Sequence, residues 1–412
     1  MRCAGLTNVR EKSIFGVLTE LHGDADGLGV TLKTYRRGKY DRGTRITVDG
    51  RGQIPVSLHL RAEGLYSNVD RTFGGKELEV GDPSFDAEVY AQGPEDELLP
   101  LLDNDTRAAV RDVVALRGQI VDGTVSIETR TWVSRDPLLR ALDTARRTAR
   151  RLRRPKDVVE RLIATMHSDH FSAVRLRCLD LLVRRFRADP RTQEALRTAL
   201  RSGSTEIRLS AGMALAEEGR ETLVEIASSS DTDEPLAVRA ISALGPKLPP
   251  DRATSILDGA IQSERPTVAL AAIQALALAG GALAVSRLAS LLAGNAADLA
   301  VAAARALASI GDVSAEASLI AALSSGQGDL RISAADALGR LGTAASVAPL
   351  HAAVDTHLLD LGLRSTAHQA IAAIQSRLPG ASPGQVSLAE GESGQLALVH
   401  EADSGRLSIA DK

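Results

Sequence analysis

Aromatic residues are scarce in this sequence. They make up 2% of it, and the last one is Phe186. Beyond that point the core has to be built from Ala, Leu, Ile and Val, whose small side chains suit closely packed, regular repeats. The same stretch lacks the Tyr and Trp side chains that dominate binding hot spots. It also lacks the aromatic platforms on which nucleic-acid bases stack.

Cysteine, a strong net charge and long apolar runs are missing as well. Cys3 and Cys178 are the two cysteines, and their spacing indicates neither a disulfide framework nor a metal knuckle. We therefore expect a reducing, cytoplasmic environment. The formal net charge of −3 gives no global attraction to nucleic acid or membranes. The first residues lack the apolar core of a signal peptide, and no uncharged run is long enough to span a membrane.

The middle of the chain contains a repeated unit. Its clearest copies are "EIRLSAGMALAEEG" from Glu206, "TVALAAIQALALAG" from Thr267, "DLAVAAARALASIG" from Asp298 and "DLRISAADALGRLG" from Asp329. We use the second residue of the "A-L" pair as an anchor, and the anchors are separated by 33, 29, 32, 31, 31 and 33 residues. A period of this length indicates a repeat architecture. The anchors are Leu182, Leu215, Leu244, Leu276, Leu307, Leu338 and Ile371.

Each period predicts a pair of helices. Small or apolar residues recur four and eight positions before the anchor, which places them on one helix face. A glycine four residues after the anchor predicts a left-handed helix stop at Gly219, Gly280, Gly311 and Gly342. A second apolar helix precedes each unit. Seven helix hairpins therefore fit between Arg154 and Leu378, and stacked hairpins of this kind form an α-solenoid of the armadillo type.

The repeat resembles the HEAT-like repeat of the phycobilisome-lyase type. The resemblance is carried by the pattern (V/I/L)-R-x-x-A-x-x-A-L-x-x-x-G at Ile207–Gly219 and at Leu330–Gly342. It implies a HEAT-like solenoid, and it does not select a task because solenoids serve many functions.

Residues 1–135 form a separate, β-rich α+β domain in our interpretation. Alternating apolar and polar residues predict strands in "GVTLKTYR", "RITVDGRGQIPVSLHLRA" and "FDAEVYAQ", and a hairpin in "QIVDGTVSIETRTWV". Helices are expected at Pro94–Leu102 and Thr106–Leu116, the second capped by Asp105. The stretch from Glu79 to Val114 resembles a domain that precedes HEAT-like repeats in bacterial proteins of unknown function, and the resemblance implies no catalytic residues.

Two further segments complete the predicted organisation. Residues 136–153 are expected to form a basic helix that connects the two domains and covers the first hairpin of the solenoid at 154–378. Residues 379–412 are expected to be a flexible acidic tail in which a short G-x-(V/L)-(S/A)-(L/I) unit recurs.

The predicted binding surface follows from the anchors. Positions two and five before each anchor should form the open face of the second helices and line the inner surface of the solenoid. A docking groove and a merely solvated face both fit these residue types, and no row of catalytic side chains is present. The candidate binding residues are Arg177, Asp180, Arg239, Gln274, Arg305, Asp336 and Gln369.

A basic lobe spans Asp136 to Arg201, with 17 Lys and Arg against 8 Asp and Glu. It permits binding to an anionic polymer, but nucleic acid is disfavoured because few aromatic residues are nearby. A seam facing the N-terminal domain or the acidic tail is the alternative. The lobe's central arginines are Arg146, Arg147, Arg150, Arg151, Arg153 and Arg154. Separately, Arg175, Arg208, Arg331 and Arg364 precede their anchors by seven residues, which favours buried ion pairs or carbonyl contacts over a ligand role.

Metal and enzyme chemistry have weak support in the sequence. His167, Asp169 and His170 could contribute to a metal site, but a further ligand is not identifiable. Among HEAT-like enzymes, deoxyhypusine hydroxylases use His-Glu pairs on successive repeats to hold iron, and the His-Glu pair here is His400-Glu401 in the tail. Bilin lyases share the repeat class, yet no bilin pocket is indicated.

The sequence therefore predicts a cytoplasmic, non-enzymatic scaffold or adaptor without a metal or cofactor, which binds protein partners through its solenoid surface. A lyase- or hydroxylase-related enzyme, or a binder of an anionic polymer, is the alternative.

Overall fold

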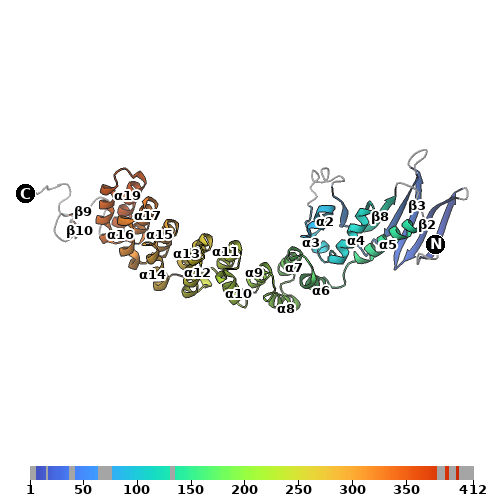
Figure 1. The fold of residues 1–412 in the computed structure, drawn as a ribbon, viewed down its shortest axis with the longest axis horizontal. Coiled ribbons are helices and arrows are strands. Elements are labelled where there is room, and N and C mark those ends of the chain that lie inside the picture. Colours follow the sequence, from blue (N-terminus) through green and yellow to red (C-terminus); the bar gives the residue numbers. More distant parts are fainter. Residues whose placement is uncertain are drawn as a thin grey trace, which may run out of the picture. The chain divides into compact units, whose positions relative to one another are not determined.

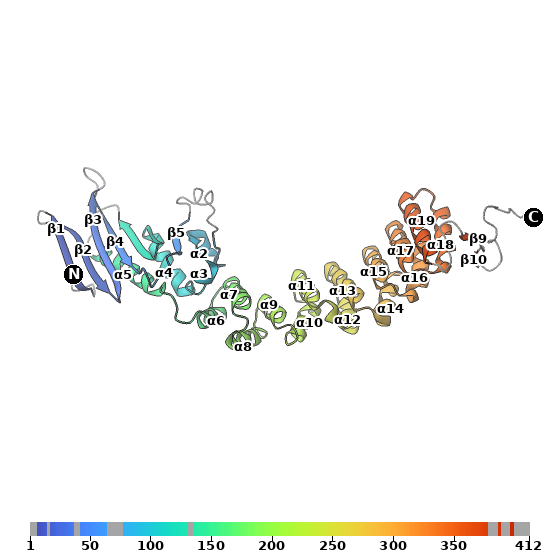
Figure 2. The ribbon, with the colours of Figure 1, turned by 180° about the vertical axis from the view of Figure 1, so that it is seen from behind.

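The computed structural model describes residues 6–14, 17–36, 42–63, 77–129, 135–377, 386–388 and 396–398. The chain divides into two compact units, Met1–Gly219 and Arg220–Lys412. The first is drawn in blue to green and the second in yellow-green to red in Figures 1 and 2. The domain boundaries expected from the sequence at residues 135, 153 and 378 stay predictions.

The first unit begins with an antiparallel sheet, which confirms the α+β character of the N-terminal part. Its eight strands lie in the order β1-β2-β3-β4-β8-β7-β5-β6. The strands are β1 (Thr7–Ile14), β2 (Val17–Ala25), β3 (Leu28–Arg36), β4 (Arg42–Asp49), β5 (His59–Ala62), β6 (Val89–Gln92), β7 (Gly118–Val121) and β8 (Thr124–Thr129).

The sheet has one buried and one polar face because its strands alternate apolar and polar residues. Val48, Val125 and Ile127 are fully buried, whereas Lys33 and Arg45 are exposed. The helices α4 and α5 contact each other and cover the buried face, α5 over β4 and β8 and α4 over β5 and β7. The helices of this part are α2 (Pro83–Glu88), α3 (Glu95–Leu98), α4 (Asn104–Ala115) and α5 (Arg135–Arg151).

Three local predictions for this part need correction. The segment "FDAEVYAQ" is not one strand, because Asp82 accepts hydrogen bonds from the backbone N–H groups of Ser84 and Phe85 and starts α2. The expected helix at Pro94–Leu102 is limited to the short α3, followed by a turn. The cap of α4 is Asp103 rather than Asp105, since the Asp103 side chain accepts from the Thr106 N–H at 2.8 Å.

Helix pairs follow the α+β part, as the repeat predicted. The first unit contains α6 (Val158–Ser168), α7 (Ser172–Arg185), α8 (Pro190–Ala199) and α9 (Thr205–Leu215). The second contains α10 (Arg220–Ser228), α11 (Glu234–Leu244), α12 (Pro250–Gln262), α13 (Pro266–Ala279), α14 (Gly281–Leu291), α15 (Ala297–Ile310), α16 (Glu316–Ser325), α17 (Gly328–Leu341), α18 (Val347–Thr356) and α19 (Leu361–Ser376). Short 3-10 turns, η2 (Gly245–Lys247), η3 (Val313–Ala315) and η4 (Ala344–Ser346), occur between helices.

The second unit is a two-layered stack of helices. The second helices of successive pairs contact one another in the order α11, α13, α15, α17, α19, and the first helices do so in the order α10, α12, α14, α16, α18. Figure 1 shows these helices side by side in the yellow-green to red part of the ribbon. All seven predicted anchors are buried, from Leu182 at 0% to Leu215 at 8% exposure, so the assignment of the core face is confirmed.

The predicted glycine stops are correct at two of four positions. Gly280 and Gly311 have positive φ angles of 64° and 73° and follow their helices directly. Gly342 has an extended backbone with a φ of −65°. At the remaining position the chain reverses at Ala216, whose φ is 51°. Gly219 instead approaches the Gly212 backbone so closely that a Cβ would lie 2.3 Å from the Gly212 carbonyl oxygen.

In the tail, β9 (Val386–Leu388) pairs antiparallel with β10 (Leu396–Leu398), with Ser387 opposite Ala397. These strands fall on two copies of the short tail repeat. The flexibility expected for the remainder of the tail concerns residues outside the described part of the chain.

Candidate functional site

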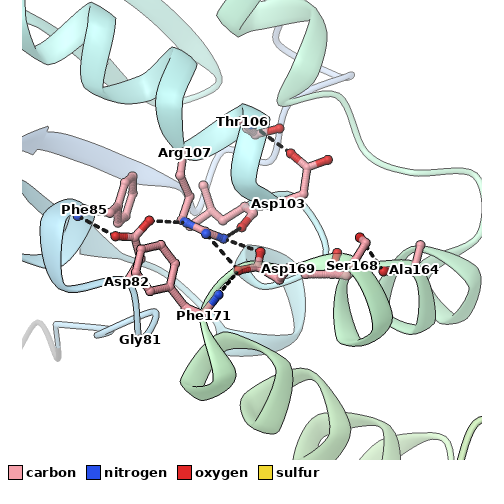
Figure 3. Close-up of polar contacts among 12 residues, drawn as sticks. Gly81, Asp82, Phe85, Asp103, Thr106, Arg107, Ala164, Ser168, Asp169 and Phe171 are labelled. Atoms are coloured by element: carbon pink, nitrogen blue, oxygen red, sulfur yellow. Dashed lines mark hydrogen bonds and ion pairs between the residues drawn. The ribbon is translucent and has the colours of Figure 1, made fainter. Parts of the chain in front are cut away.

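A buried arginine links the α+β part to the first helix pair within the first unit. Arg107 lies on α4, and its side chain is 1% exposed. Its Nε donates to Asp82 at 2.8 Å. Its two terminal nitrogens donate to the carboxylate of Asp169, at 2.8 and 3.0 Å, in the connection between α6 and α7. Figure 3 shows the guanidinium enclosed by these two carboxylates.

The buried charges of this cluster have hydrogen-bond partners. Arg107 also donates to the Leu102 carbonyl at 2.9 Å, and its guanidinium lies 5.7 Å from the ring centre of Phe171. Burial alone would lower the pKa of Arg107, but the hydrogen bonds to Asp169 and Asp82 hold it above its ordinary value. Two carboxylates and one guanidinium that are almost fully buried need such complete pairing, because each buried ion loses most of its hydration. We name Arg107, Asp82 and Asp169 the Arg107 node.

The node changes the interpretation of the "HSDH" segment. Asp169 was a candidate metal ligand with His167 and His170, and its carboxylate is 1% exposed and occupied by Arg107. No group of three or more His, Cys, Asp or Glu side chains that could hold a metal ion occurs among the described residues. His400 and Glu401 lie outside them.

Arginines of the basic lobe face carboxylates of the α+β part. Arg147 pairs with Asp112 at 2.7 Å and Arg151 with Asp105 at 3.1 Å, both across α5 and α4. The remaining contacts run from Arg146 to Asp26 at 3.2 Å, from Arg153 to the Asp26 carbonyl, and from Arg154 to Glu97 at 3.7 Å. Arg150 is exposed, and no contact of its side chain is observed in the described residues.

The same pattern continues along the first helix pair. Arg161 on α6 pairs with Asp103, and Arg184 on α7 pairs with Glu95 at 2.8 Å. The basic lobe is therefore a seam against the protein's own acidic residues, which is the alternative that the sequence left open. We call these ion pairs the basic seam.

The candidate binding residues of the first unit belong to this seam or to a helix contact. Arg177 lies 3.9 Å from Glu95 and is half-buried. Asp180 accepts a hydrogen bond from the Ser210 hydroxyl at 3.1 Å, which joins α7 to α9.

The candidates of the second unit lie on successive second helices. Arg239, Gln274, Arg305, Asp336 and Gln369 are all exposed, on α11, α13, α15, α17 and α19 respectively. Asp336 pairs with Arg340 one turn later at 3.2 Å. No ion pair or side-chain hydrogen bond of Arg239 or Arg305 is observed among the described residues. We call these five residues the exposed row.

The residues five positions before each anchor are less exposed to solvent than predicted. Ala271 and Ser333 are 7% and 6% exposed. Each second helix packs between two neighbours, so its exposed strip is narrower than that of a helix at the surface of a sheet. Arg239 is the exception and is exposed.

The arginines seven before their anchors behave differently from one another. Arg331 donates to the Gly326 carbonyl at 2.7 Å, as predicted for a carbonyl contact. Arg364 is exposed, which corrects its predicted burial. Arg175 is half-buried, and its Nε is buried without a hydrogen-bond partner in the described part of the protein.

Sequence reasoning did not find Arg107, although a signal was present. Arg107 follows a capping aspartate in "DNDTRAAV" and occupies the first turn of an otherwise apolar helix face, beside the buried Thr106. The pairing with Asp82 and Asp169 spans 25 and 62 residues, so no local pattern could supply it.

Comparison with known proteins finds remote similarity to solved structures. No family model matches the sequence, and no curated protein matches it. A solved structure of human deoxyhypusine hydroxylase in complex with glycerol is 22% identical, covers 58% of this chain and 91% of its own, and has a TM-score of 0.29. A solved structure of an engineered protein is 21% identical, covers 68% of this chain and 78% of its own, and has a TM-score of 0.36.

These findings correct one expectation and add one fact. The prediction that the chain is not an enzyme is withdrawn, because deoxyhypusine hydroxylase, a structural neighbour of the HEAT-like group, is an enzyme. None of the helices in the described ranges combines the length and the apolar character needed to cross a membrane. The chain is a largely helical protein with an N-terminal antiparallel sheet, and its structural neighbours include a HEAT-repeat-like helical protein.

Proposed function

We propose that the protein binds a protein partner through the exposed row of its second unit. The observation that carries this proposal is one exposed polar side chain on each of five stacked second helices. Four of these residues lie two positions before the anchor, and Arg239 lies five positions before it, on the same open side of its helix. An extended polypeptide laid across such a stack would meet one side chain per repeat, and several weak contacts would add.

The charges of the row favour an acidic partner segment. Arg239 and Arg305 are exposed guanidinium groups whose donors are available to carboxylates, and Asp336 is already paired with Arg340. Leu278 lies four residues after Gln274 on α13 and is 64% exposed, so it offers an apolar contact on the same face. The partner class that fits best is an extended segment with acidic residues and an aliphatic anchor.

The basic lobe is a poorer candidate for the partner surface. Arg147, Arg151 and Arg154 already contact carboxylates of the same chain, so binding an anionic polymer there would compete with existing ion pairs. An outside partner would gain less from these arginines than from Arg239 and Arg305.

The test is affinity capture from the native cell with the full chain as bait, followed by mass spectrometry. Arg239→Glu with Arg305→Glu should remove the partner that the unmodified chain recovers. Arg252→Glu is the matched control, because Arg252 is an exposed arginine on α12, in the other helix layer. A partner that is lost equally with the control, or retained by the double variant, contradicts the assignment.

A further inference from the structure

A cavity in the first unit has the chemistry of an anion site. It measures about 510 Å³ and lies among α6, α7, α8 and the start of α9. Arg175, Arg197 and Arg201 line it together with His167, and Glu194 is its acidic lining residue. A cavity of this size suits a small ligand, since ligand pockets commonly measure roughly 300–1,000 Å³.

Two of the three arginines have no partner in the described part of the chain. Arg197 donates to Glu218 at 2.8 Å and to Glu194 at 3.2 Å, so its charge is already used by two carboxylates of the same chain. The Nε of Arg175 is buried and makes no hydrogen bond. Arg201 is exposed, and its side chain makes no observed contact. Arg175 and Arg201 both line the cavity and have no carboxylate partner among the described residues, so an incoming oxyanion would supply the missing counter-charge.

The backbone beside the arginines supplies further donors. The 11-residue helix α9 begins at Thr205, and its N-cap residue Ser204 makes no side-chain capping hydrogen bond. Ile207 in the first turn of α9 lines the cavity, as do Ser202 and Gly203 just before the helix. The first N–H groups of a helix have no intrahelical acceptors and favour phosphate, as does the positive end of the helix dipole.

We infer that this cavity binds a phosphate group, held by Arg175, Arg201 and the start of α9. Guanidinium groups bind phosphate oxygens through paired N–H donors, which gives both charge and direction. Met166, Ala199 and Ile207 provide an apolar wall against which the organic part of a phosphate monoester can pack. The lining contains no Phe, Tyr or Trp side chain for a base to stack on, so a small phosphate is favoured over nucleic acid.

The site is independent of the exposed row, because all of its lining residues belong to the first unit. It also accounts for an arginine that the basic seam does not use. Arg175 is a half-buried repeat arginine whose side chain makes neither an ion pair nor a carbonyl contact with the described residues, in contrast with Arg331.

Isothermal titration calorimetry on the full chain, with inorganic phosphate and with glycerol 3-phosphate as probes, tests the inference. Saturable binding is expected, and it should weaken about tenfold or more in Arg175→Gln and in Arg201→Gln, because each removes a charge-assisted hydrogen bond. Arg201 is exposed, so its replacement leaves the fold intact. Arg175→Lys keeps the positive charge but lacks the paired N–H donors of the guanidinium, so this variant should bind phosphate with intermediate affinity.

Arg150→Gln is the matched control, since Arg150 is an exposed arginine outside the cavity with no side-chain hydrogen bond or ion pair to the described residues. Tighter binding of glycerol 3-phosphate than of inorganic phosphate would identify a monoester as the ligand, and equal affinities would identify the free ion. Absence of saturable binding, or the same affinity in all four variants, would overturn the inference. Tighter binding of a short duplex DNA that is lost in the same two glutamine variants would overturn it in favour of an anionic polymer.

Discussion

Different interactions stabilise the interiors of the two units of this protein. In the first, one buried apolar cluster extends from Leu21 to Leu215, and charged contacts are added to it, with the Arg107 node in the interior and the basic seam at the surface. In the second, buried Ala, Leu and Ile side chains of stacked helices form the core, and ion pairs between helices are few among the described residues. The difference shows why a count of arginines misleads when it is used to locate a binding surface.

The same difference indicates which arginines are used within the molecule and which are available to a partner. Paired arginines in the first unit position helices against a sheet, so their charge is used within the molecule. Some arginines of the second unit also contact neighbouring helices, as Arg287 does with Asp258. Arg239 and Arg305 have no such contact among the described residues. Unpaired, exposed charge is therefore a better guide to a partner surface than total charge.

The largest effect is expected from a charge in the core of the second unit. Leu307 is 1% exposed on α15, and Leu307→Asp would bury an unpaired carboxylate at a cost of several kcal/mol, roughly 3–5. Hydrogen exchange should show faster exchange across α10–α19, with peptides of residues 7–129 unchanged. Leu278→Asp on α13 is the control, because Leu278 is 64% exposed and should tolerate the change. Equal damage from both variants would contradict the assigned core face.

A loss of stability of similar size, located in the first unit, is expected from a change in the Arg107 node. Arg107→Met removes the cation and leaves Asp82 and Asp169 buried without it, which should cost about 3–5 kcal/mol. The loss should appear as accelerated exchange in α2, α4 and the α6–α7 connection, and not in α13–α19. Arg111→Met is the control, since Arg111 and Glu88 form a pair at 2.6 Å whose side chains are 39% and 50% exposed. Such an exposed pair contributes little to stability, so its loss should leave the exchange of these helices nearly unchanged.

How much of this could be predicted differs between the units for a physical reason. The second unit repeats one local pattern, so the anchors Leu276, Leu307 and Leu338 could be identified from spacing alone, and all are buried. The Arg107 node depends on residues 62 positions apart, whose meeting is decided by the packing of a sheet against helices. The exposed row could be proposed from the sequence, whereas the cavity around Arg175 could not, because Arg201 belongs to another helix pair.

A smaller effect is expected from acid, and it should fall mainly on the first unit. Hydrogen bonds from Arg191 hold the pKa values of Asp157 and Asp189 below the ordinary 3.8, and a hydrogen bond from Arg197 holds that of Glu218 below 4.5. A lowered folded-state pKa adds stability above the ordinary value, and this stability is lost as the pH falls through the lowered value. Between about pH 6 and about pH 3, exchange in α6–α9 should therefore accelerate more than in α13–α19.

Arg191→Gln provides the control for the acid experiment. It removes the largest cause of the lowered pKa at both Asp157 and Asp189, so the variant should be less stable at neutral pH and less sensitive to acid. An unchanged acid response in this variant would show that other groups govern the transition.

The most direct test of the account is partner recovery from two charge-reversed chains measured side by side. One carries Arg147→Glu, Arg150→Glu and Arg151→Glu in the basic lobe, and the other carries Arg239→Glu and Arg305→Glu in the exposed row. We predict that the lobe variant keeps the partner while its first unit exchanges faster, and that the row variant loses the partner with unchanged exchange. Loss of the partner in the lobe variant and its retention in the row variant would contradict the account and place the partner surface on the basic lobe.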